Sequence, residues 1–141
     1  MKGLLLIVLL LLPFQAIADD DYKLGTYWTV TGVDTEPGHF EDYISDLKNG
    51  WRKALESQKK DGKIVSYQMF ANVNAREGEP DLWLLVEWKS GAAMLDTPKS
   101  YWDDQGKKLW GSLDKGKEAG KKRGKIRTIM GDTLMRELTF N

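Results

Sequence analysis

The sequence predicts an α+β fold in which helices cover one face of a four-stranded antiparallel sheet. A long stretch, 39–60, has apolar residues at helical spacing and follows a strand-like segment. Two further strand-like segments, 64–73 and 82–89, are separated by a short turn. A second helical stretch and a final extended segment complete the order β-α-β-β-α-β, which is the split βαβ arrangement.

The first predicted strand, 24–33, is rich in β-branched and aromatic residues. Trp28 and Val30 share one parity, whereas Tyr27 belongs to the other. We assign the parity of Trp28 to the side of the sheet that faces the helices and the parity of Tyr27 to the opposite side. The residues that follow, 34–38, include a proline and a glycine and predict a turn.

The stretch 39–60 is the clearest helix in the sequence. Its apolar residues form one stripe at three- and four-residue spacing: Phe40, Tyr43, Ile44, Leu47, Trp51, Ala54 and Leu55. Gly50 lies within this stretch, where a glycine costs about 1 kcal/mol relative to alanine. We therefore expect Gly50 to mark a place where a neighbouring element packs closely.

The segments 64–73 and 82–89 predict a β-hairpin. In the second of them both parities are apolar, which is typical of a strand that is covered on both faces. With both helices on one side, the other side of the sheet would expose a contiguous apolar surface, and such surfaces mark interfaces. We therefore predict a homodimer whose interface contains Tyr27, Phe70, Trp83 and Leu85.

The C-terminal half has a less regular pattern. A short helix is expected at 91–95, before Pro98, and a second amphipathic stretch then carries Trp102, Leu109, Trp110 and Leu113. The fourth strand is predicted from Thr133 onward, after a bend at 131–132. The pattern leaves 126–130 open between helix and strand.

This element order, the long first helix and the hairpin of YQMFANV and DLWLLVEW resemble the dimeric α/β-barrel superfamily, over about 24–140. The antibiotic-biosynthesis monooxygenase-like domains are one branch of it. The resemblance implies a ferredoxin-like fold, a dimeric barrel of two face-to-face sheets, and a ligand cavity between sheet and helices in each subunit. Members include cofactor-independent oxygenases, haem-degrading enzymes, isomerases and proteins without a known reaction, so the fold alone does not select a function.

Residues 1–18 have the layout of a cleavable secretory signal. A basic residue, Lys2, precedes the apolar run 4–12, and small residues lead to Ala18. The apolar run is too short to cross the roughly 30 Å hydrocarbon core of a membrane. We expect cleavage after Ala18, which would leave residues 19–141 as one periplasmic or secreted domain without a membrane anchor. The absence of cysteine excludes disulfides.

The formal net charge of the chain is zero, but its charges are unevenly distributed. Acidic residues gather in 19–48 and basic residues in 107–127. Aromatic residues do not interleave the basic segment, so we expect no nucleic-acid partner. No nucleotide or nucleophile motif occurs, and His39 has no second histidine or cysteine to share a metal, so we also expect no metal or cofactor.

Two residues are candidates for catalysis. His39 could act as a general base, because imidazole titrates near neutral pH, or it could simply begin the helix. Glu87 interrupts an apolar strand and could transfer protons with a raised pKa. The alternative for Glu87 is a cross-strand partner, for which the candidates are Gln68, Thr29 and Arg136.

Three aromatic residues, Trp28, Tyr67 and Trp88, share the parity assigned to the helix side. They either line a pocket for a flat apolar ligand or fill the core against Tyr43 and Trp51. The sequence thus favours an exported domain that binds a small apolar ligand or a protein partner as a homodimer. The alternative is a cofactor-independent, monooxygenase-like enzyme that acts on an aromatic or quinone-like substrate.

Overall fold

An antiparallel sheet with the strand order β2-β3-β1-β4 forms one layer of the molecule. The computed structural model describes residues 21–141, so the predicted signal in 1–18 lies outside the described residues. The strands are β1 (Tyr22–Thr35), β2 (Ile64–Ala71), β3 (Leu82–Trp88) and β4 (Arg127–Phe140). The predicted hairpin of β2 and β3 is confirmed.

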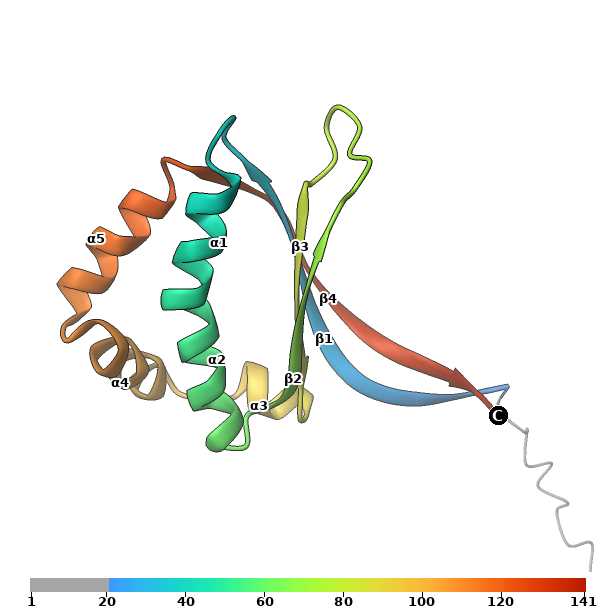
Figure 1. Ribbon diagram of the computed structural model, residues 1–141. Coiled ribbons are helices and arrows are strands. Elements are labelled where there is room, and N and C mark those ends of the chain that lie inside the picture. Colours follow the sequence, from blue (N-terminus) through green and yellow to red (C-terminus); the bar gives the residue numbers. More distant parts are fainter. Residues whose placement is uncertain (1–20) are drawn as a thin grey trace, which may run out of the picture.

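The helices form the second layer, on one side of this sheet (Figure 1). They are α1 (Phe40–Asn49), α2 (Trp51–Lys60), α3 (Gly91–Leu95), α4 (Lys99–Trp110) and α5 (Leu113–Arg123). Together with the strand order, this placement confirms the predicted ferredoxin-like α+β fold. In the described part of the chain, each helix is too short or too polar to span a membrane.

The long helix predicted over 39–60 is divided at Gly50 into α1 and α2. A Cβ atom at this position would lie 3.1 Å from the ring of Trp110, at the end of α4, which is closer than ordinary van der Waals contact. The expectation that Gly50 marks close packing is therefore confirmed. The two helices still stack end to end, because the amide of Gly50 donates to the carbonyl of Asp46 in α1 and the carbonyl of Gly50 accepts from the amide of Ala54 in α2.

The core lies between the α1–α2 stripe and the sheet. Alternate residues of β3 point into it, which gives this strand its pattern of buried and half-buried positions. Two clusters make up the core: Val33, Tyr43, Leu47, Leu82 and Leu84 in one, and Leu55, Ile64, Val86 and Trp88 in the other.

The register of β1 corrects the predicted faces of two residues. Tyr27 lies opposite Trp88, and Trp28 lies opposite Glu87. Opposed residues of an antiparallel pair project from the same face, so Tyr27 is on the helix side, where it packs on the core, and Trp28 is on the uncovered side. The prediction exchanged them because both parities of β1 carry apolar residues, and alternation alone does not tell which parity faces the helices.

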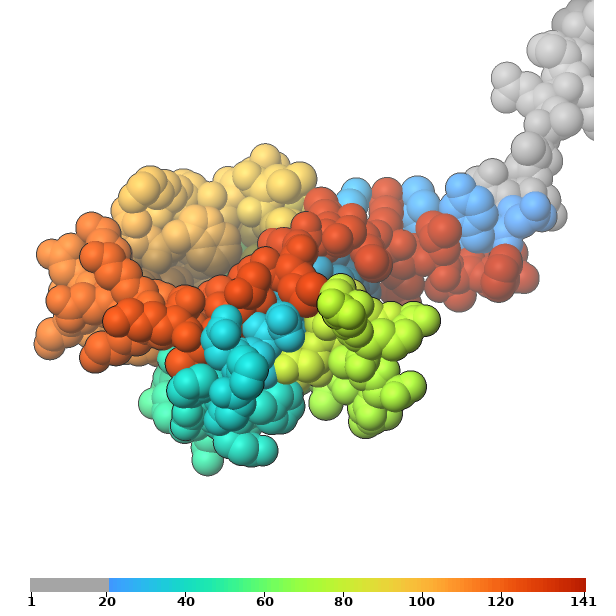
Figure 2. All heavy atoms as spheres, turned by 90° about the horizontal axis from the view of Figure 1, so that it is seen from above, coloured from blue at the N-terminus to red at the C-terminus, as the bar shows by residue number. Residues whose placement is uncertain are grey.

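The fourth strand is also longer than predicted, because β4 continues through the expected bend. Gly131 pairs with Gly32 and Asp132 pairs with Thr31, whereas Met130 is an extra residue between two paired positions. Met130 therefore forms a β-bulge rather than a turn. The start of β1 and the end of β4 run side by side beyond the rest of the sheet (Figures 1 and 2).

The core assignment predicts the effect of a charge at Leu47, which is 2% exposed. We expect Leu47→Asp to lower the free energy of unfolding by about 3 to 5 kcal/mol, because an unpaired carboxylate would enter the core. Chemical denaturation measures this change. The control, Ser45→Asp, places the same charge on an exposed position of α1 and should change stability little. Equal midpoints for the two variants would contradict the assignment.

Candidate functional site

An apolar slot opens between the α1–α2 pair and the edge strand β2. It has a volume of about 230 Å³ and is lined by Ile44, Leu47, Lys48, Trp51, Arg52, Tyr67 and Met69. We call this set of residues the apolar slot. The two cations belong to its rim, and the other five side chains form its floor and walls.

Local periodicity places these side chains together. Ile44, Leu47 and Trp51 follow the three- and four-residue spacing of one helix face. Tyr67 and Met69 alternate on β2, opposite Val86 and Leu84, and so project toward the helices. Burial decreases along β2: Ile64 is buried beneath the helices, whereas Met69 is 46% exposed. The helix pair and β2 therefore diverge, and the slot lies where they separate.

An aromatic pair forms the floor of the slot. The rings of Trp51 and Tyr67 meet edge to face, with centroids 5.4 Å apart. The Tyr67 hydroxyl donates a hydrogen bond of 2.6 Å to Oε1 of Glu56. This bond, followed by burial, raises the pKa of Tyr67, while the nearby Arg52 guanidinium acts in the opposite direction. The phenol therefore keeps its proton at neutral pH and holds the Glu56 carboxylate beside the slot.

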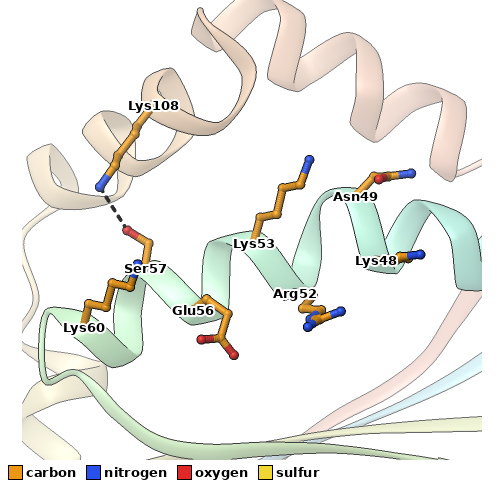
Figure 3. A pocket seen from close by; sticks show the side chains of 8 residues that line it. All are labelled: Lys48, Asn49, Arg52, Lys53, Glu56, Ser57, Lys60 and Lys108. Atoms are coloured by element: carbon orange, nitrogen blue, oxygen red, sulfur yellow. Dashed lines mark hydrogen bonds between the residues drawn. The ribbon is translucent and has the colours of Figure 1, made fainter.

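A second, more polar hollow adjoins the slot (Figure 3). It has a volume of about 470 Å³, and we call it the basic hollow; it is lined by Lys48, Asn49, Arg52, Lys53, Glu56, Ser57, Lys60 and Lys108. Figure 3 shows Arg52 and Glu56 on the side of the helix toward the sheet, and Lys53 on the side toward α4. Lys48 and Arg52 line both the hollow and the slot.

The structure does not bring the three predicted ligand-binding residues together. Tyr67 lines the slot. Trp88 is 8% exposed within the core, where its Nε1 donates a 3.1 Å hydrogen bond to Oγ1 of Thr29 and its ring meets Trp102 edge to face. Trp28 lies on the opposite side of the sheet. Trp88 is therefore a core residue, and Tyr67 is the one residue of the three that lines the slot.

The candidate catalytic residues lie away from the slot. His39 precedes α1, and its Nδ1 is 2.9 Å from Oδ2 of Asp42 at the surface. Within residues 21–141, no three histidine, aspartate or glutamate side chains gather as a metal site would require.

Glu87 lies on the uncovered side of the sheet. It accepts hydrogen bonds from the hydroxyls of Thr26, at 2.9 Å, and Ser66, at 2.6 Å. These two partners differ from the candidates expected from the sequence. Of those candidates, Arg136 instead lies over the ring of Tyr27, with its Cζ 4.8 Å from the centroid.

Three of the four predicted interface residues do share the uncovered face of the sheet. Phe70 pairs with Trp83 in the sheet, and Leu85 follows on the same face of β3. Trp28 takes the place of Tyr27 there, next to Val30. The uncovered face is thus at least as apolar as predicted.

Five slot residues were not expected from the sequence to lie at a ligand site: Ile44, Leu47, Lys48, Arg52 and Met69. Ile44, Leu47 and Met69 have the pattern of core residues, whereas the two cations have the pattern of an ordinary solvent-exposed helix face. One signal was present in the sequence: the two cations lie four residues apart, directly beside the apolar stripe of the first helix.

No protein-family model matches the chain, and no curated protein matches it. Among solved structures, it is similar to a conserved protein from Methanosarcina mazei Go1, with 15% identity and a TM-score of 0.46 over 79% of this chain and 90% of the other. It is also similar to a dimeric ferredoxin-like protein from an uncultured marine organism, with 13% identity and a TM-score of 0.45 over 84% and 90% of the two chains.

A third similar structure is an antibiotic biosynthesis monooxygenase-like protein from Bordetella bronchiseptica. The identity is 14% and the TM-score 0.45, over 83% of this chain and 99% of the other. The neighbours thus include the kinds of protein that the sequence pattern resembles. Identities this low say nothing about a shared activity.

The placement of Trp88 leads to a test on one side chain. We expect Trp88→Ala to lower the free energy of unfolding by about 3 to 5 kcal/mol, because it would leave a cavity between the helices and the sheet. Thermal and chemical denaturation measure the loss. Trp88→Phe keeps most of the packing and should lose much less. An alanine variant that unfolds like the parent would contradict the core placement.

Proposed function

We propose that the chain is an exported, homodimeric domain that binds a small apolar ligand in the apolar slot. The observation that carries the proposal is the slot itself: an aromatic floor of Trp51 and Tyr67 with aliphatic walls, open to solvent at Met69. Pockets that bind small molecules combine mainly apolar walls with a few polar groups that orient the ligand. Lys48 and Arg52 are the polar groups of this rim.

The dimensions of the slot limit the ligand. Its volume of about 230 Å³ is below the range of about 300 to 1,000 Å³ that is usual for drug-sized ligands. A single ring or a short acyl chain fits such a space, whereas a multi-ring quinone does not. Neither His39 nor Glu87 lines the slot, so the slot offers no support for the monooxygenase-like alternative.

Homodimer formation is proposed from the uncovered face of the sheet. Trp28, Val30, Trp83 and Leu85 lie side by side there, and Phe70 extends the patch to the edge. In a twofold interface the same face of each copy is in contact with the other, and an apolar face can be buried in this way against its own copy. Export is proposed from the pattern of residues 1–18, which end in small residues at Ala16 and Ala18.

Filling the slot tests the ligand proposal. We expect the parent to bind the neutral single-ring probe n-butylbenzene, and we expect Met69→Trp to abolish the binding because the larger ring would occupy the slot. Titration calorimetry measures this. The control, Val65→Trp, changes another residue of β2 with similar exposure, 43% against 46%, outside the slot. A parent that binds no apolar probe would refute the proposed function.

A charge on the uncovered face tests the dimer. We expect the parent to sediment as two copies and Leu85→Arg to sediment as one, because a guanidinium would have to be desolvated in the interface. Sedimentation velocity measures both species, and circular dichroism checks that the variant is folded. Val73→Arg, in the exposed loop after β2, is the matched control and should remain dimeric. A monomeric parent would exclude the interface.

A further inference from the structure

The rim of the apolar slot carries two cations that form no salt bridge. Lys48 and Arg52 are one helical turn apart, and both border the slot. Neither forms a salt bridge with a carboxylate anywhere in residues 21–141. Two cations without a salt bridge therefore border an apolar cavity, and Glu56, one turn after Arg52, instead accepts the hydrogen bond of Tyr67.

Only some of the other basic residues of the helices form salt bridges within residues 21–141. Lys99 pairs with Asp103 and Lys117 with Asp114, each one turn away, and Arg123 pairs with Asp46 across the helices. Such pairs stabilise exposed helix faces. Lys48 and Arg52 form no such pair within residues 21–141, and neither do the lysines of the basic hollow.

The surroundings of the rim add further positive charge. The basic hollow contributes Lys53, Lys60 and Lys108, against one carboxylate, Glu56. One oxygen of that carboxylate is already bonded to the Tyr67 hydroxyl. A concave surface lined by one sign of charge concentrates ions of the opposite sign. An anion is therefore favoured where the hollow meets the slot.

We propose that the ligand of the slot is an amphiphile with a carboxylate head group, which Arg52 and Lys48 bind while its apolar body lies on Trp51 and Tyr67. The inference rests on the proposed function of the slot and names the class of its ligand. The planar guanidinium of Arg52 presents paired N–H donors that match the two oxygens of a carboxylate. Lys48 adds a second charge on the same rim.

The position of the two cations fits this division of the ligand. They are the residues shared by the slot and the hollow, so a head group bound to them leaves the rest of the molecule on the apolar side. The Tyr67 proton is directed to Glu56 and not into the slot. Recognition of the head group therefore depends on the rim.

Octanoate and octanamide provide the test, because they share an alkyl chain and differ in the charge of the head group. We expect the parent to bind octanoate about tenfold more tightly than octanamide, the difference that a charge-assisted hydrogen bond supplies. Calorimetry measures the affinities, and the indole N–H resonance of Trp51 reports whether the slot is occupied. Rising salt should weaken the binding of octanoate and leave octanamide unchanged.

Single variants locate the head group. Arg52→Gln should bind octanoate about tenfold more weakly and octanamide as well as the parent does. Lys59→Gln removes a cation of the same helix that borders neither the slot nor the hollow, and it should behave like the parent. Both positions are exposed on α2, so both variants should fold.

The outcomes separate this inference from the proposed function. Equal affinity for the two compounds would overturn the carboxylate head group and leave an apolar binding site. A preference for octanoate that persists in Arg52→Gln, or in Met69→Trp with its slot filled, would place the anion elsewhere and overturn the inference. Binding of neither compound, together with failure of the neutral probe, would refute the proposed function itself.

Discussion

The packing of the α1–α2 stripe on alternate residues of β3 is the interaction on which the other features depend. Tyr43 and Leu47 rest on Leu82 and Leu84, so the helix pair lies over the middle of the sheet. Edge strand β2 is then only partly covered, because its helix-side residues emerge progressively from beneath the helices, as far as Met69. The apolar slot is thus a geometric consequence of where the first helix pair lies, and it needs no separate structural element.

Gly50 allows close packing on the other side of the same helix pair. Because it has no side chain, the ring of Trp110 packs directly on the junction of α1 and α2, and the guanidinium of Arg123 also lies within 3.2 Å of where a Cβ would be. This contact holds the end of α4 against the helix pair and brings Lys108 next to Ser57, where the two share a hydrogen bond. The contribution of α4 to the lining of the basic hollow therefore depends on Gly50, although a glycine within a helical stretch lowers helix stability.

The sequence predicted the features that follow from the spacing of apolar residues along the chain. It did not predict the features that depend on how neighbouring strands pair. The spacing of Phe40 to Leu55 correctly predicted the helix face that packs in the core. The faces of Tyr27 and Trp28 were exchanged, since β1 is apolar on both parities and only cross-strand pairing identifies the helix side. The slot could not be predicted, because it is built from residues of two elements whose divergence no local pattern encodes.

The two proposed activities of the domain use opposite faces of one sheet. The slot lies on the helix side of β2, whereas Trp83 and Leu85 project from the other side of β3. A second copy docked on the uncovered face would therefore leave the slot open to solvent in each subunit. Phe70 and Met69 are neighbours on β2 that point to these opposite sides, so this strand carries both surfaces. The backbone of β2, an edge strand whose outer side has no neighbour within the sheet, therefore connects the two surfaces.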